Sequence, residues 1–174
     1  MSKDDMHLHT QSDGFQMVRL PYGEEERFAM DVLLPDEGTD IHQFRDQLDM
    51  GTWLSASDDL NETRVDVTMP SFELEYDTGS DLNDVLQDLG MGIAYSGEAD
   101  FTPMSSVAPF LSTVVQKTYI RVDEEGTEAA AVTGGAMVES MPPQFRVDRP
   151  FVFMITDTET DTILFLGQVT DPSE

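Results

Sequence analysis

The sequence of 174 residues predicts an α+β fold in which strands outnumber helices. Apolar segments of strand length recur along the whole chain, whereas helical spacing of apolar residues is clear at only two places. Hydrophobic residues make up 39% of the chain, with 10 Phe and 11 Met, which is enough to fill a core. A disordered acidic tail is therefore excluded, and the length on its own would suit one domain.

The first predicted elements are two strands and a helix. Residues 16–22 have the pattern of a strand, and after a turn residues 27–34 are so apolar that we expect burial on both faces. Asp40 is expected to cap a helix whose buried face carries Ile41, Phe44 and Leu48. A short apolar segment around Trp53 follows.

A long extended segment is predicted over residues 64–76, where Pro70 shifts the register of the apolar face. The strongest helical pattern begins at Asp81 and ends at Gly90. Its apolar face consists of Leu82, Val85, Leu86 and Leu89. Residues 91–112 are expected to be mostly loop.

Three further strands are predicted in the last third of the chain, at residues 114–122, 151–155 and 163–166. The last two are joined by the acidic residues 157–161. We therefore expect a buried hairpin with an acidic tip.

Charge limits the partners of this protein. Thirty-five acidic and 9 basic residues give a formal net charge of −26. We expect no nucleic acid as partner, because nucleic acids and anionic membranes need a basic face. We also expect no membrane as partner, because no run approaches the about 20 apolar residues that span a bilayer.

The net charge also affects stability. Repulsion among this many acidic side chains destabilises a compact state unless salt screens it. The sequence therefore predicts an acidic, halophilic protein from a saline environment, with an ordinary acidic protein as the alternative.

Few residues could carry catalysis or hold a metal. The chain has no Cys, which excludes disulfides, thiolate zinc ligands and cysteine nucleophiles. His7 and His9 share one face of an extended segment, but no further ligands stand out, and a solvated strand end is the preferred interpretation. The only other His is His42, and no Gly-x-Ser-x-Gly elbow occurs. We therefore expect no enzyme activity, no cofactor and no metal site.

Asp157, Glu159 and Asp161 have the spacing of the first half of a calcium-binding loop. Thr162 and Gln168 stand where that loop needs Gly and Glu, so the pattern fails. A hairpin tip is the better interpretation.

Residues Asn61, Glu62 and Thr63 fit the acceptor pattern for N-linked glycosylation. Three-residue patterns often arise by chance. At this level the pattern only indicates that the stretch is exposed.

Residues 123–143 differ from the rest of the chain. They run for about 20 residues without a helical or strand pattern, which in a compact domain is typical of a functional loop. The first half is rich in Gly, Ala and Thr, and small side chains can be exposed in one state and buried in a sheet in another. A flexible linker or a weak Ala-rich helix is the alternative.

Several tracts resemble the serpin family. Residues 145–155 match the tract that follows the serpin reactive-centre loop, and residues 100–105 and 165–172 resemble other serpin segments in the right order. The hinge of that loop is similar to Glu124, Glu125, Gly126, Thr127, Glu128, Ala129, Ala130 and Ala131. The likeness extends from about Met17 to Pro172.

The resemblance implies that residues 1–174 are the C-terminal half of a single serpin domain, with the reactive-centre loop at residues 123–143. Residues 114–122 would then be the fifth strand of the family's large sheet and residues 72–76 part of the sixth, and the last hairpin would lie in the second sheet. The missing N-terminal half would be a partner of this chain. We expect Met1 to be an internal methionine of a longer protein, or the gene to be truncated.

The resemblance also implies a mechanism. Serpins act as suicide substrates of serine proteases, because the cleaved loop inserts into the large sheet before the acyl-enzyme is hydrolysed. Counting back from the Pro-Pro pair that ends the loop places the attacked bond at Glu139–Ser140, whereas counting from the hinge places it after Ser140. Glu139 would suit an acid-accepting protease. Cleavage after Met137 or Val138 would suit an elastase-like or subtilisin-like protease.

The resemblance is incomplete at three positions. Val132 interrupts the run of small residues in the hinge. Gln116 stands where many relatives have His, and Ser71 stands where some have a Lys that would pair with Glu124. These differences concern how easily the large sheet opens and not the fold.

A non-inhibitory serpin fragment that acts as a binding module is the alternative to an inhibitor, because the missing half would supply the strand beside which the loop inserts. Such a fragment would leave one edge of strand 114–122 open. The compartment is unknown, and the family resemblance favours an extracellular location.

Salt dependence of stability tests the interpretation of the charge. We expect the free energy of unfolding to rise from dilute buffer to molar NaCl, because the screening length falls from ~10 Å at 0.1 M to ~3 Å at 1 M. Urea unfolding at both salt concentrations, followed by the fluorescence of the single Trp, measures it. Equal stability in the two buffers would contradict adaptation to salt.

Overall fold

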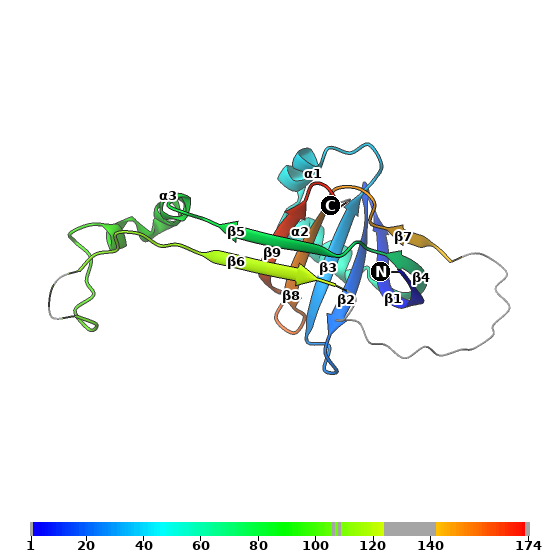
Figure 1. The fold of residues 1–174 in the computed structure, drawn as a ribbon. Coiled ribbons are helices and arrows are strands. Elements are labelled where there is room, and N and C mark those ends of the chain that lie inside the picture. Colours follow the sequence, from blue (N-terminus) through cyan, green and yellow to red (C-terminus); the bar gives the residue numbers. More distant parts are fainter. Residues whose placement is uncertain (1, 106, 108, 124–141, 173–174) are drawn as a thin grey trace. The chain divides into compact units, whose positions relative to one another are not determined.

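The computed structural model describes residues 2–105, 107, 109–123 and 142–172. The chain divides into two compact units, residues 1–72 with 123–174 and residues 73–122. The described strands form one sheet of seven strands and one of two (Figure 1). Within the described residues, no helix has the length and hydrophobicity needed to cross a membrane.

The first unit is built on the seven-stranded sheet, in the order β7-β4-β1-β2-β3-β8-β9. Its strands are β1 (Ser2–Ser12), β2 (Phe15–Tyr22), β3 (Phe28–Pro35), β4 (Asn61–Thr68), β7 (Gln144–Arg146), β8 (Phe151–Asp157) and β9 (Thr162–Val169). Neighbouring strands are antiparallel except β4 and β7, which are parallel. The predicted strands at 16–22 and 27–34 and the predicted final hairpin are confirmed.

The sequence indicated a strand end at His7 and His9, which lie in β1, but it did not predict the rest of this strand, whose polar residues give no alternating apolar pattern. This strand forms because it pairs with β2 on one side and with β4 on the other, so both edges of its backbone are hydrogen-bonded. The turn into β2 contains Gly14 with φ of 84°, a left-handed conformation that Gly adopts without strain.

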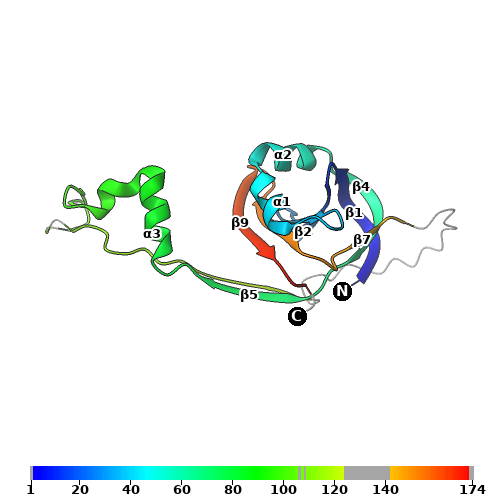
Figure 2. The same ribbon diagram turned by 90° about the horizontal axis from the view of Figure 1, so that it is seen from above.

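Two helices cover one face of this sheet (Figure 2). They are α1 (Ile41–Gln47) and α2 (Met50–Asp58), and α2 is longer than the short segment predicted around Trp53. As predicted, Asp40 caps α1: its carboxylate accepts hydrogen bonds from the backbone N–H groups of Gln43 and His42, which hold the pKa of Asp40 below its usual value. The buried cluster between helices and sheet contains Phe15, Met17, Leu33, Ile41, Phe44, Trp53, Ala56, Val152 and Met154.

An aromatic cluster lies on β8. The rings of Phe151 and Phe153 are fully buried, and Phe72 packs against both with centroid distances of 5.7 and 5.4 Å. Gly167 is the cross-strand partner of Phe153 on β9, and a Cβ atom at this position would overlap the Phe153 ring. The sequence therefore needs Gly in β9 because of the ring beside it.

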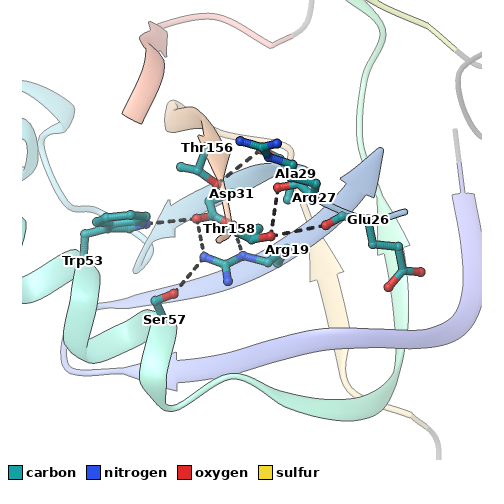
Figure 3. Close-up of polar contacts among 9 residues, drawn as sticks. All are labelled: Arg19, Glu26, Arg27, Ala29, Asp31, Trp53, Ser57, Thr156 and Thr158. Atoms are coloured by element: carbon teal, nitrogen blue, oxygen red, sulfur yellow. Dashed lines mark hydrogen bonds and ion pairs between the residues drawn. The ribbon is translucent and has the colours of Figure 1, made fainter. Parts of the chain in front are cut away.

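A buried polar network joins the sheet to α2 (Figure 3). Arg19 on β2 and Asp31 on β3 are cross-strand partners, and their side chains form two hydrogen bonds of 2.6 and 2.8 Å. The same carboxylate accepts a hydrogen bond of 2.9 Å from Trp53 Nε1, and Arg19 donates another of 2.8 Å to Ser57 Oγ. Burial alone would lower the pKa of Arg19, but the hydrogen bond and charge of Asp31 outweigh it and raise the pKa.

A second ion pair joins the tip of the β8–β9 hairpin to Arg27, the residue before β3. Arg27 Nη2 lies 2.7 Å from Asp157 Oδ2, and Arg27 Nε lies 3.4 Å from Glu159 Oε2. The hydrogen bond from Arg27 lowers the pKa of Asp157. The carboxylate at the start of the predicted hairpin tip is thus bonded to a guanidinium, and Thr158 next to it donates hydrogen bonds to the carbonyls of Glu26 and Arg27 (Figure 3).

The second unit is built on β5 (Phe72–Asp77) and β6 (Lys117–Val122), with α3 (Asp81–Leu86), the π-helix η1 (Gln87–Met91) and the 3₁₀ helix η2 (Gly92–Tyr95) between them. The predicted extended segment 64–76 is confirmed as two strands, β4 and β5, which lie in different sheets with Pro70 between them. The helix predicted to end at Gly90 is α-helical only to Leu86 and continues as η1, within which Gly90 has φ of 101°.

The Arg19–Asp31 pair provides a stability test with a matched control. The exposed pair Arg45–Asp46 has the same shortest N–O distance, 2.6 Å, but its side chains are 52% and 66% exposed, against 12% and 0% for Arg19 and Asp31. We expect Asp31→Ala to lower the free energy of unfolding by about 3–5 kcal/mol, because it leaves a buried guanidinium uncompensated.

The control Asp46→Ala should change it by less than about 1 kcal/mol. Urea unfolding followed by circular dichroism avoids reliance on Trp53, whose environment the first variant changes. Equal losses in the two variants would contradict a structural role for the buried pair.

Candidate functional site

The predicted site residues lie outside the described part of the chain. The structure does not describe residues 124–141, which include the predicted hinge, Glu124 to Ala131, and the predicted bond Glu139–Ser140. The candidate site is therefore built from the described residues at its two ends, which are β6 before it and β7 after it.

The C-terminal end is attached to the seven-stranded sheet. The carbonyl of Pro143 accepts a hydrogen bond of 3.0 Å from the Asp66 backbone N–H, and β7 then pairs in parallel with Asp66–Thr68 of β4. Phe145, in the middle of β7, is fully buried, and the His9 ring contacts it edge-on at 6.1 Å. The alternation of Gln144, Phe145 and Arg146 thus directs one apolar side chain inward and two polar ones outward.

The N-terminal end is attached to β5. The backbone N–H of Thr78 donates to the carbonyl of Gln116, and the N–H of Gln116 donates to Thr78 Oγ1. Lys117 Nζ lies 2.9 Å from Asp77 Oδ2. This contact raises the pKa of Lys117 and lowers that of Asp77, and both side chains are largely exposed.

Asn83 in α3 fixes the residues just before β6. Its Oδ1 accepts a hydrogen bond of 2.7 Å from the Val114 N–H, and its Nδ2 donates to Thr113 Oγ1 at 3.0 Å and to the Ser80 carbonyl at 2.9 Å. The strand predicted to begin at residue 114 begins at Lys117 instead. The reason is that the backbone N–H groups of Val114 and Gln116 donate to side chains, Asn83 Oδ1 and Thr78 Oγ1, and not to carbonyls of a neighbouring strand.

Sequence reasoning missed Asn83 because it identified the buried face of α3 by hydrophobicity. In the structure Asn83 is the buried residue of α3, whereas Val85 is 52% and Leu89 is 76% exposed. The predicted apolar face was therefore wrong for these two residues. Leu82 and Leu86 of that face are half-buried, and the hydrogen bonds of Asn83 to the following loop also hold the helix in its unit.

The strand β6 has one open edge within the described residues. It pairs with β5 alone in the two-stranded sheet. Lys117, Tyr119 and Arg121 are exposed on one face, and the residues between them are half-buried. A strand at the edge of a sheet can accept a further strand beside it.

Comparison with known proteins identifies the family of this chain. The profile of the family Serpin (serine protease inhibitor) matches residues 1–172. The chain belongs to the serpin family. It is 39% identical to Serpin B6 of Pongo abelii over 163 residues, which are 90% of this chain and 43% of that protein. It is also 31% identical over 180 residues to a protein of Oryza sativa subsp. japonica named "Probable non-inhibitory serpin-Z9", covering 98% of this chain and 40% of that protein.

The structure of the chain also resembles solved serpin structures. The crystal structure of the thermophilic serpin tengpin in its native state superposes with a TM-score of 0.77 at 28% identity, covering 98% of this chain and 45% of tengpin. The chain thus spans less than half the length of these serpins and contains a part of the serpin fold.

The two asparagines of the chain give a matched test of how β6 is positioned, since each follows an Asp-Leu pair. We expect Asn83→Ala to lower the free energy of local opening at residues 113–116 by about 1–3 kcal/mol, because the substitution leaves the Val114 N–H without its acceptor. Hydrogen exchange of peptides from residues 113–122, measured by mass spectrometry, should become faster.

The control Asn61→Ala removes one hydrogen bond, from Asn61 Nδ2 to the Asp59 carbonyl, in the other unit. It should leave exchange in this region unchanged. Unaltered exchange in Asn83→Ala would show that β6 is positioned in another way.

Proposed function

We propose that this chain carries the reactive-centre loop of a serpin-type inhibitor of serine proteases and acts as a suicide substrate. The observation that carries the proposal is the pair of attachments around residues 124–141. Among the described strands, the one that leads into the segment pairs with β5 alone. The strand that follows the segment is anchored to the other sheet by parallel pairing and a buried Phe145. A segment held in this way can be cut without release of its C-terminal part.

The proposed reaction starts at the bond Glu139–Ser140. The serine hydroxyl of the protease attacks the carbonyl carbon of Glu139, the C–N bond to Ser140 breaks, and the new amino group of Ser140 takes a proton. The hinge, Glu124 to Ala131, then enters the sheet as a strand while the protease remains bound to Glu139 as an ester. Each new hydrogen bond of the strand stabilises the inserted state by about 0.5–1.5 kcal/mol. The insertion has to be faster than hydrolysis of the ester between the protease and Glu139.

The composition of the hinge supports this role. Small side chains between Gly126 and Ala131 can pass from solvent into a sheet with little steric hindrance, and Thr127 favours the strand conformation. The chain would act as a substrate analogue and not as an enzyme. Its partners would be a serine protease of the subtilisin-like, elastase-like or acid-accepting class.

The second candidate function is that of a non-inhibitory binding module, favoured by the observation that the chain covers only 43% of Serpin B6. A loop can insert only where strands lie on both sides of the gap, and β6 supplies one side. In this case the partner is the N-terminal half of the serpin domain, which would pair with the open edge of β6.

Incubation with a glutamate-specific, an elastase-like and a subtilisin-like protease separates the two functions. An inhibitor should form a complex with one of them that survives denaturing electrophoresis, with the cut between Glu139 and Ser140 located by mass spectrometry. Cleavage without a complex would favour the binding module. A cut outside residues 137–141 would contradict the placement of the bond.

A hinge variant provides the internal control. We expect Thr127→Arg to be cleaved at an unchanged rate but to lose most of the stable complex, because a large charged side chain slows entry into the sheet. The matched variant Thr160→Arg changes an exposed residue of the β8–β9 turn and should form as much complex as the original chain. Equal complex formation by both variants would contradict insertion through this hinge.

A further inference from the structure

The glycosylation pattern at the start of β4 plays no part in the proposed inhibition. The structure places Asn61 and Glu62 on the surface and leaves Thr63 half-buried. Leu60, immediately before them, packs against the core cluster of the first unit. The position of the pattern is therefore fixed by an apolar anchor, while its acceptor residue faces solvent.

The side chains of Asn61 and Thr63 lie on the same face of β4, because residues two apart in a strand point in the same direction. Thr63 Oγ1 donates a hydrogen bond of 3.4 Å to the carbonyl of Asn61, so the hydroxyl lies next to the acceptor residue. Asn61 Nδ2 donates to the carbonyl of Asp59 at 2.7 Å, on the exposed end of the strand. The hydroxyl thus bonds to the backbone of the acceptor residue, and the acceptor amide bonds to the residue two positions before it.

The exposure of Asn61 leaves room for a bulky group. Asn61 lies on the face of β4 that carries the buried residues Val65 and Val67, but it is the first residue of the strand and its side chain is exposed. N-linked glycans need a surface position of this kind.

We propose that Asn61 is the acceptor of an N-linked glycan. The donor is an oligosaccharide linked to a polyisoprenyl diphosphate. The Asn61 amide nitrogen attacks the anomeric carbon, forming a C–N bond as the C–O bond to the diphosphate breaks. The diphosphate leaves with the electron pair, the amide nitrogen loses one proton to a base, and no atom is oxidised or reduced.

The test uses the full chain, expressed behind a cleavable secretion signal in yeast, with secreted and cell-retained protein both analysed. Intact mass before and after peptide N-glycosidase treatment gives occupancy, and peptide mapping gives the position. We expect a glycan at Asn61 in the original chain and in Thr63→Ser, which keeps the hydroxyl. We expect its complete loss in Asn61→Gln and in Thr63→Ala.

The proposal is overturned if the original chain carries no glycan at Asn61, or if Thr63→Ala keeps it. Fluorescence of Trp53, which is buried in a different element, checks that each variant is folded. The outcome does not depend on protease inhibition, so it can fail while the proposed function holds.

Discussion

The rest of the first unit depends on one buried charge, the carboxylate of Asp31. It lies on β3, an interior strand of the sheet that pairs with β2 and β8, and the other residues of this strand are apolar. A buried carboxylate without partners would be highly unfavourable, so Arg19 and Trp53 must both reach it. These contacts set the register of β2 against β3 and the position of α2, and with them the core between helix and sheet.

The two ends of the candidate loop are held by different means. At one end, β7 is short, but it follows a hydrogen bond from Asp66 to Pro143 and buries Phe145 completely. At the other end, β6 relies on β5 and on the hydrogen bonds of Asn83. In the proposed inhibition a protease cuts the segment between these two ends. The buried Phe145 and the pairing of β7 with β4 would then keep its C-terminal part attached to the seven-stranded sheet.

The strong negative charge and the ion pairs respond differently to salt. Surface contacts such as Lys117–Asp77 weaken when salt screens them, and so does the general repulsion between acidic residues. The pair of Arg19 and Asp31 is screened much less because it is buried. A protein with this composition can therefore keep its buried polar network in a saline medium. It loses only surface ion pairs, which contribute little to the free energy of unfolding.

The sequence alone determined the family resemblance, the apolar strands β2, β3, β8 and β9, and the cap of α1 at Asp40, because these follow from local patterns of side chains. It could not predict the extent of β1, the strand β7 or the role of Asn83. The strands β1 and β7 carry polar or short patterns and exist because neighbouring strands complete their hydrogen bonds. Asn83 is buried because the backbone of a residue 31 positions away needs an acceptor, and only the tertiary structure brings the two together.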